Sequence, residues 1–126
     1  MALQLRQTNP AQFDIYEDSA GALQARHGTD ELSAHGDTVV IWTDDDALEV
    51  RFTAPSGWTL GGTHEDEDGD PVAWTREGSS CVVRFADATT DPVEVTLEGQ
   101  AQGSSETKTK KVHVHAKPKG ALPDGG

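Results

Sequence analysis

The part of this sequence with the clearest potential for chemistry is an acidic loop, HEDEDGD, at residues 64–70. Asp66, Asp68 and Asp70 alternate in it, and their carboxylate oxygens are the hard ligands that Ca²⁺ takes. The EF-hand order is absent, because aligning the loop glycines puts Thr75 where that motif has a bidentate Glu. Two interpretations follow: a site for a divalent cation, Ca²⁺, or a solvated acidic hairpin loop.

A second candidate is the VHVH segment near the C-terminus. His113 and His115 lie two positions apart in an expected strand, so they share one face, where a third ligand from a neighbouring strand would complete a Zn²⁺ or Ni²⁺ site. The alternative is an exposed pair of imidazoles on a lysine-rich strand, with Val112 and Val114 facing the core.

Cys81 is the only cysteine of the sequence. A single thiol excludes a disulfide within this chain and every site that needs two thiolates. No histidine lies close in sequence to lower its pKa, so we expect a small buried hydrophobe. The sequence also has no GxSxG elbow, HExxH motif, phosphate loop or dinucleotide fingerprint. We therefore predict that the protein is not an enzyme.

Short segments with alternating apolar residues must position these side chains. Leu48, Val50 and Phe52 alternate with polar residues, as do Val93, Val95 and Leu97, and turn residues separate such runs at intervals of roughly 8 to 12 residues. This pattern predicts an all-β fold, a single antiparallel β-sandwich of about 8–9 strands in a Greek key. Residues 1–118 would form this domain, and residues 119–126 a flexible Pro/Gly-rich tail.

The net charge of −12 is the strongest compositional signal. All lysines lie between residues 108 and 119, whereas every acid but Asp124 precedes residue 108. An acidic body should repel nucleic acid and anionic membranes, and it favours a basic partner. No apolar run is long enough to span a bilayer, and the N-terminus lacks the apolar region of a secretory signal. We therefore expect a cytoplasmic location, with a secreted mature form left open.

The segment ELSAHGDTVVIWTDDD, residues 31–46, resembles the cupredoxin pattern of a Gly-Asp turn, a Val-rich strand ending in Trp, and a polar loop. The resemblance implies a cupredoxin-like or immunoglobulin-like sandwich. In cupredoxins a His follows the polar loop, and Cys, His and usually Met cluster near the C-terminus. Here ALEVRF follows the loop, VVRFADATT follows Cys81, and the only methionine is Met1. The ligands of a type 1 copper site are therefore missing.

These observations favour a non-enzymatic protein-interaction or structural module that binds another protein or assembles with itself. The residues we expect on the interaction surface are Trp58, Asp44, Asp45, Asp46, His113 and His115. Opposite charges on the body and the lysine-rich end would support head-to-tail association that weakens with salt. The alternatives are a Ca²⁺-binding module and an acidic decoy that covers a basic protein surface.

Overall fold

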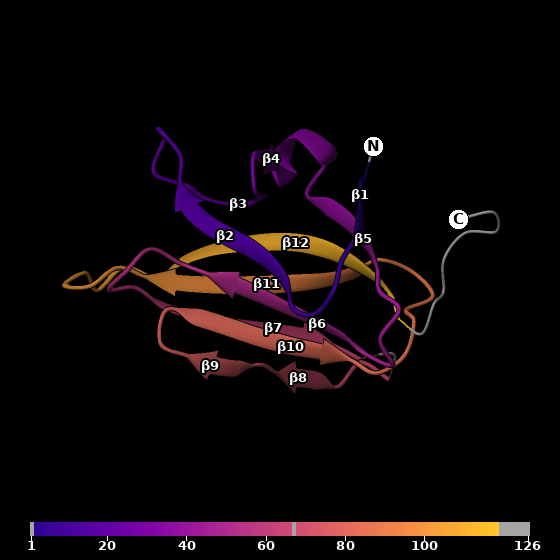
Figure 1. Ribbon diagram of the computed structural model, residues 1–126. Helices are drawn as coiled ribbons and strands as arrows, with labels where there is room; N and C mark the ends of the chain where they lie inside the picture. The colour runs from indigo at the N-terminus through magenta and orange to yellow at the C-terminus, as the bar shows by residue number, and fades with distance from the viewer. Residues whose placement is uncertain (1, 67, 119–126) are drawn as a thin grey trace.

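The computed structural model describes residues 2–66 and 68–118, which form two mixed β-sheets of six strands each (Figure 1). Sheet A contains, in spatial order, β1 (Leu3–Arg6), β5 (Thr38–Trp42), β12 (Lys108–Lys117), β11 (Val93–Gln100), β7 (Thr59–Glu65) and β8 (Pro71–Ala73). Sheet B contains β4 (Asp30–Glu31), β3 (Leu23–His27), β2 (Ala11–Glu17), β6 (Leu48–Thr53), β10 (Ser80–Phe85) and β9 (Thr75–Glu77). The 3-10 helix η1 (Leu32–His35) connects β4 to β5.

The all-β architecture predicted from the alternating pattern is confirmed. In β6 the residues Leu48, Val50 and Phe52 are buried while their neighbours are half exposed, as a strand with one face against a core requires. The buried residues of both sheets form one hydrophobic cluster, which includes Phe13, Phe52, Val39, Ile41, Leu60, Leu97, Val112 and Val114.

Two parts of the fold prediction were wrong. The sheets are not purely antiparallel, because β5 pairs in parallel with β1 and β12, and β2 pairs in parallel with β6. The described residues also contain twelve strands rather than 8–9. An alternating burial pattern is the same in both kinds of pairing, so it gives no strand direction. The additional strands include β1, of four residues, and β4, of two, which are too short to be recognised as strands from the sequence pattern alone.

The strand directions bring three loops to one end of the molecule. β5 and β12 run in parallel, β11 runs against β12, and β7 runs against β11. Consequently the loop after β5 (43–47), the loop after β7 (66–70) and the loop before β11 (86–92) lie at the same end, on the right in Figure 1. We call this the acidic end, because each of these loops carries aspartates.

No helix among the described residues is long and apolar enough to cross a membrane. The tail expected at residues 119–126 lies outside the described part of the chain.

Candidate functional site

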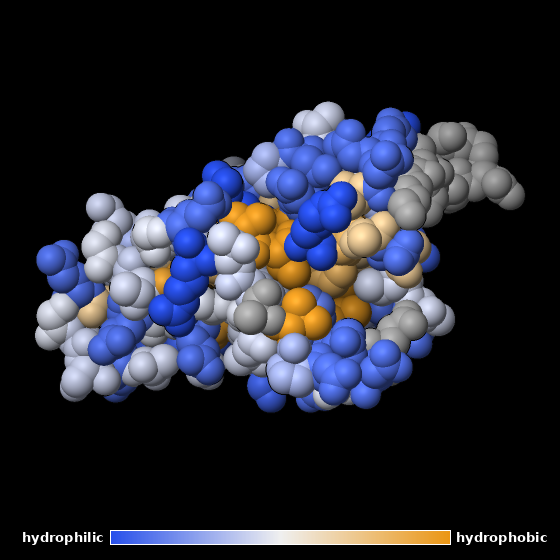
Figure 2. Space-filling model, turned by 90° about the horizontal axis from the view of Figure 1, so that it is seen from below, coloured by the Kyte–Doolittle hydropathy of each residue, from blue (hydrophilic) through white to orange (hydrophobic). Residues whose placement is uncertain are grey.

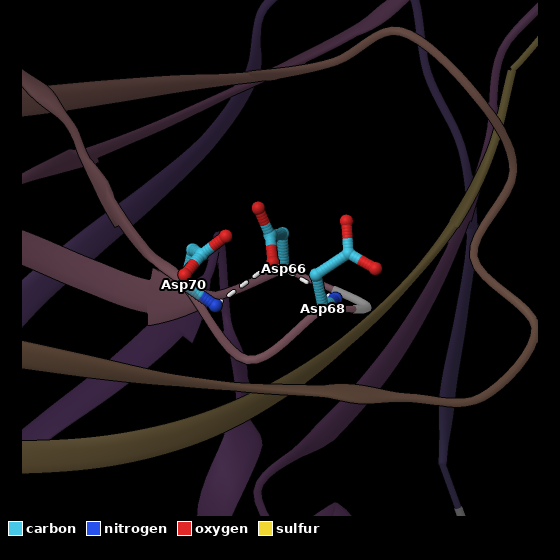
Figure 3. Close-up of side chains that lie close together, drawn as sticks. All are labelled: Asp66, Asp68 and Asp70. Atoms are coloured by element: carbon cyan, nitrogen blue, oxygen red, sulfur yellow. Dashed lines mark hydrogen bonds between the residues drawn. The ribbon is translucent and has the colours of Figure 1, made fainter.

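The three aspartates of the 66–70 loop lie close together, as Figure 3 shows. One carboxylate oxygen from each of Asp66, Asp68 and Asp70 lies within 4.8 Å of the others, and all three side chains are exposed. Oδ1 of Asp66 accepts hydrogen bonds from the backbone N–H groups of Asp68 and Asp70, each at 2.9 Å. One of the three carboxylates is therefore already used to close the loop.

The loop between β2 and β3 has the same hydrogen bonds, although it carries only one aspartate, Asp18. Oδ1 of Asp18 accepts the N–H groups of Ala20 at 2.9 Å and Ala22 at 3.0 Å. The fourth residue of both loops is a glycine with positive φ, 80° at Gly21 and 84° at Gly69, where a side chain would be strained. The geometry of the 66–70 loop is thus that of an Asp-closed hairpin turn.

Asp44, Asp45 and Asp46 lie at the acidic end, but they do not extend the 66–70 cluster. The N–H of Asp45 donates to Oγ1 of Thr43 at 3.3 Å, and Asp44 lies 3.6 Å from the guanidinium of Arg6. In the described part of the chain, the Asp66, Asp68 and Asp70 cluster is the only group of three or more His, Cys, Asp or Glu side chains close enough to share an ion. The 43–47 loop therefore contributes negative charge to this end rather than ligands.

The two histidines of VHVH lie on one face of β12, as expected, and Val112 and Val114 are buried on the opposite face. His115 Nε2 forms a 3.0 Å hydrogen bond with the backbone carbonyl of Thr89. The Thr89 hydroxyl also accepts the N–H of Ala116 at 3.0 Å. His115 and its neighbour thus fix the 86–92 loop to the end of β12.

Trp58 lies apart from the other residues expected on the interaction surface. It precedes β7, at the end of the molecule opposite the acidic end, and packs half buried against the hydrophobic core. A Cβ added at Gly99 would lie 3.3 Å from the Trp58 ring, so this glycine makes room for the indole. Trp58 and the aspartates of the acidic end therefore do not share one surface.

The structure reveals a groove that the sequence did not indicate. It has a volume of about 750 Å³ and lies between the β7–β8 hairpin on one side and β10 with the 86–92 loop on the other. We call it the acidic groove. Its apolar lining includes Val72, Phe85 and Val93, and its charged lining includes Glu65, Asp66, Asp87, Asp91, Glu94 and Arg84. On the face below the molecule, hydrophobic side chains gather near the centre with hydrophilic ones around them (Figure 2).

His64 connects this groove to the core. Its Nδ1 accepts a 2.9 Å hydrogen bond from the indole Nε1–H of Trp74, and its ring lies 5.3 Å from that of Phe85. Partial burial lowers the pKa of His64, while the negative charge of Asp66 opposes that shift. A sequence signal for this arrangement was present in Gly61 and Gly62, because paired glycines in a strand leave room for a large neighbouring side chain.

Cys81 is fully buried in β10, as the sequence predicted. Burial raises the pKa of its thiol to about 12, although the positive charge of Arg76 acts in the opposite direction. Since the thiolate is the nucleophilic form, the folded protein offers no reactive sulfur.

Three lysines of the basic segment in the sequence are paired with acids in the fold. Lys108 contacts Glu17, Lys110 lies 3.0 Å from Asp37, and Lys111 lies 3.6 Å from Glu94. Their strand, β12, is inside sheet A between β5 and β11. The acidic body and the basic segment are therefore not two separate poles.

No family model matches this sequence, and neither a curated protein nor a solved structure matches it.

Proposed function

We propose that this protein is a non-enzymatic interaction module that binds a positively charged protein segment in its acidic groove. As part of this proposal, its two sheets form a sandwich of the cupredoxin-like or immunoglobulin-like kind that carries no copper. The partner is a different chain, since Lys108, Lys110 and Lys111 are paired with acids of their own chain.

The observation that carries the proposal is the convergence of two acidic loops, 66–70 and 86–92, on a partly apolar groove. Glu65, Asp66, Asp91 and Glu94 line the groove, and Arg84 is the only Lys or Arg among the lining residues that the structure describes. A cationic segment would lower the repulsion among these carboxylates and cover apolar surface, since interfaces combine a buried apolar centre with a charged rim.

A fluorescein-labelled peptide of alternating lysine and valine tests the proposal by fluorescence anisotropy. We expect saturable binding at low salt that weakens as the salt concentration rises, because the rim charges are exposed and screened. A peptide with glutamate in place of lysine should not bind. The proposal fails if the lysine peptide does not bind at low salt.

Two triple variants locate the site. E65Q/D91N/E94Q neutralises three acids of the groove, and E77Q/E98Q/E106Q neutralises three acids outside it. Three exposed charge contacts account for about tenfold in Kd, so the groove variant should bind about tenfold more weakly than the wild type. Equal losses in the two variants would mean that net charge attracts the peptide and that the groove does not.

A further inference from the structure

The two sheets share an unusual edge on the side of the acidic groove. After β8 pairs with Thr63–Glu65 of β7, the chain crosses at Trp74 from sheet A to sheet B, where β9 pairs with Ser80–Val82 of β10. Each of these short strands covers only half of its neighbour. Among the strands that the structure describes, none pairs with the remaining part of β10, Val83–Phe85, on this side. We call this segment the open edge of β10.

The corresponding half of β7 is covered by side chains instead. A Cβ at Gly62 would lie 2.6 Å from Cε3 of Trp74, and a Cβ at Gly61 would lie 2.6 Å from a guanidinium nitrogen of Arg76. Trp74 and Arg76 thus pack directly against the backbone of that half of β7. The open edge of β10 differs, since Arg84 and Phe85 line the acidic groove.

The backbone of Arg84 faces this opening. The carbonyl of Ser79 accepts a 2.8 Å hydrogen bond from the N–H of Ala54, so it points toward the β6 side of β10. Alternate residues of a strand direct their N–H and C=O groups to opposite sides. The backbone groups of Val83 and Phe85 therefore bond to β6, and those of Arg84 point to the open edge. An additional strand would find one donor and one acceptor there.

The neighbouring edge of β8 is less able to accept a strand. In the β7–β8 hairpin, the N–H of Asp66 donates to the Asp70 carbonyl at 2.9 Å. The backbone groups of Val72 therefore point to β7, and those of Pro71 point to the free side of β8. Proline has no N–H to donate, and short strands with proline are protected against edge pairing. The open edge of β10 is therefore the better docking strand of the two.

We infer that the acidic groove binds its partner by strand addition: an extended segment pairs antiparallel with the open edge of β10. Two side chains of this segment, opposite Val83 and Phe85, point inward beside Val72 and are apolar. Basic residues precede them, because the segment enters from the acidic end, beside Asp91 and Glu65. The antiparallel direction is the more stable pairing per residue.

This inference rests on the proposed function, and a labelled peptide KKVTVT separates the two. In the proposed register its first threonine lies opposite Arg84, and N-methylation of that threonine removes the N–H that would donate to the Arg84 carbonyl without changing the charge. Loss of this bond and of close strand contact should weaken binding by about tenfold or more. The reversed peptide TVTVKK, of equal composition, should also bind more weakly.

Two protein variants test the same bond from the other side. Arg84→Pro removes the N–H at the open edge, whereas Arg84→Ala removes only the charge. Arg84→Ala should bind KKVTVT at least as tightly as the wild type, and Arg84→Pro about tenfold more weakly. If Arg84→Pro does not fold, as judged by circular dichroism, the methylated peptide decides the question alone.

The outcomes distinguish the two levels of the proposal. If KKVTVT does not bind, the proposed function and the strand addition both fail. If it binds, but the methylated and reversed peptides bind equally well, the groove attracts cations and strand addition is wrong. Dimerisation of the free protein that Arg84→Pro abolishes would mean that a second copy occupies the edge, which would overturn the proposed partner.

Discussion

The indole Nε1–H of Trp74 donates a 2.9 Å hydrogen bond to Nδ1 of His64, and this bond joins the wall of the acidic groove to the core. Trp74 is only 8% exposed and its ring stacks on Phe52 at 5.7 Å. The bond exists only while Nδ1 of His64 carries no proton, because a protonated nitrogen cannot accept it. The groove therefore depends on neutral His64.

The first prediction concerns pH. Burial lowers the pKa of folded His64 below its ordinary value of 6.5, so the unfolded chain takes up the proton first as the pH falls. The stabilisation of the folded state by neutral His64 is complete above about pH 6.5, and it is lost as the pH falls from there toward the lower pKa of folded His64. We expect the free energy of unfolding to decrease by about 1 kcal/mol between about pH 7 and about pH 5, measured by urea denaturation.

His64→Gln should remove most of this decrease, since glutamine does not titrate and its side-chain oxygen can accept the indole N–H. His35→Gln is the matched control, because it leaves the Trp74 to His64 hydrogen bond in place. If the two variants show the same pH dependence, the decrease does not come from His64.

The second prediction concerns the paired glycines of β7. Gly62→Ala would place a Cβ 2.6 Å from the buried ring of Trp74, which cannot move without disturbing the core. We expect a loss of about 2 kcal/mol in unfolding free energy. Gly61→Ala meets the mobile end of Arg76 instead, so it should be nearly neutral in the same denaturation experiment. A larger loss of unfolding free energy for Gly61→Ala than for Gly62→Ala would contradict this account of how the two glycines are packed.

The strands that were predicted correctly share one physical property: their burial alternates within a few residues. Leu48, Val50 and Phe52 in β6, and Val95 and Leu97 in β11, are buried as the pattern indicated. The crossover at Trp74 could not be predicted in this way. The segment VAWTREG is continuous in sequence, but it is divided between β8 and β9 of two sheets, because Trp74 packs against Phe52, far away in sequence.

The acidic groove could not be predicted from the sequence either. Its walls come from β7, β8, β10 and the 86–92 loop, and Thr89 holds that loop through bonds to His115 and Ala116. Such contacts depend on strand order, which the alternating pattern does not contain. The pattern did place His113 and His115 on one face, yet it gave no sign that His115 anchors a loop.

The third prediction concerns the role of Asp66. Asp66→Ala removes the acceptor for the N–H groups of Asp68 and Asp70, so the melting temperature should fall by a few degrees. Asp68→Ala is the matched control, since it removes the same charge without removing that acceptor. We expect the difference between the variants to be the same with Ca²⁺ and with a chelator, because the Asp18 hairpin forms the same bonds without the two additional aspartates.

A cation site would give a different result. Ca²⁺ would raise the melting temperature of the wild type, and Asp68→Ala would lose that increase, because a ligand that binds only the folded state stabilises it. Calorimetric heat of Ca²⁺ binding that Asp68→Ala abolishes would support the same conclusion.

The last prediction concerns Cys81. Burial raises the pKa of its thiol from 9.0 to about 12, and the side chain is fully inaccessible in β10. At about pH 8 a disulfide reagent that reacts with thiolates should therefore label the native protein at least about a hundredfold more slowly than the protein in denaturing urea. The native rate should rise with added urea, since labelling requires opening of the core. Cys81→Ala provides the blank, and native labelling as fast as that of the unfolded chain would show an accessible thiolate and reopen the question of nucleophilic chemistry.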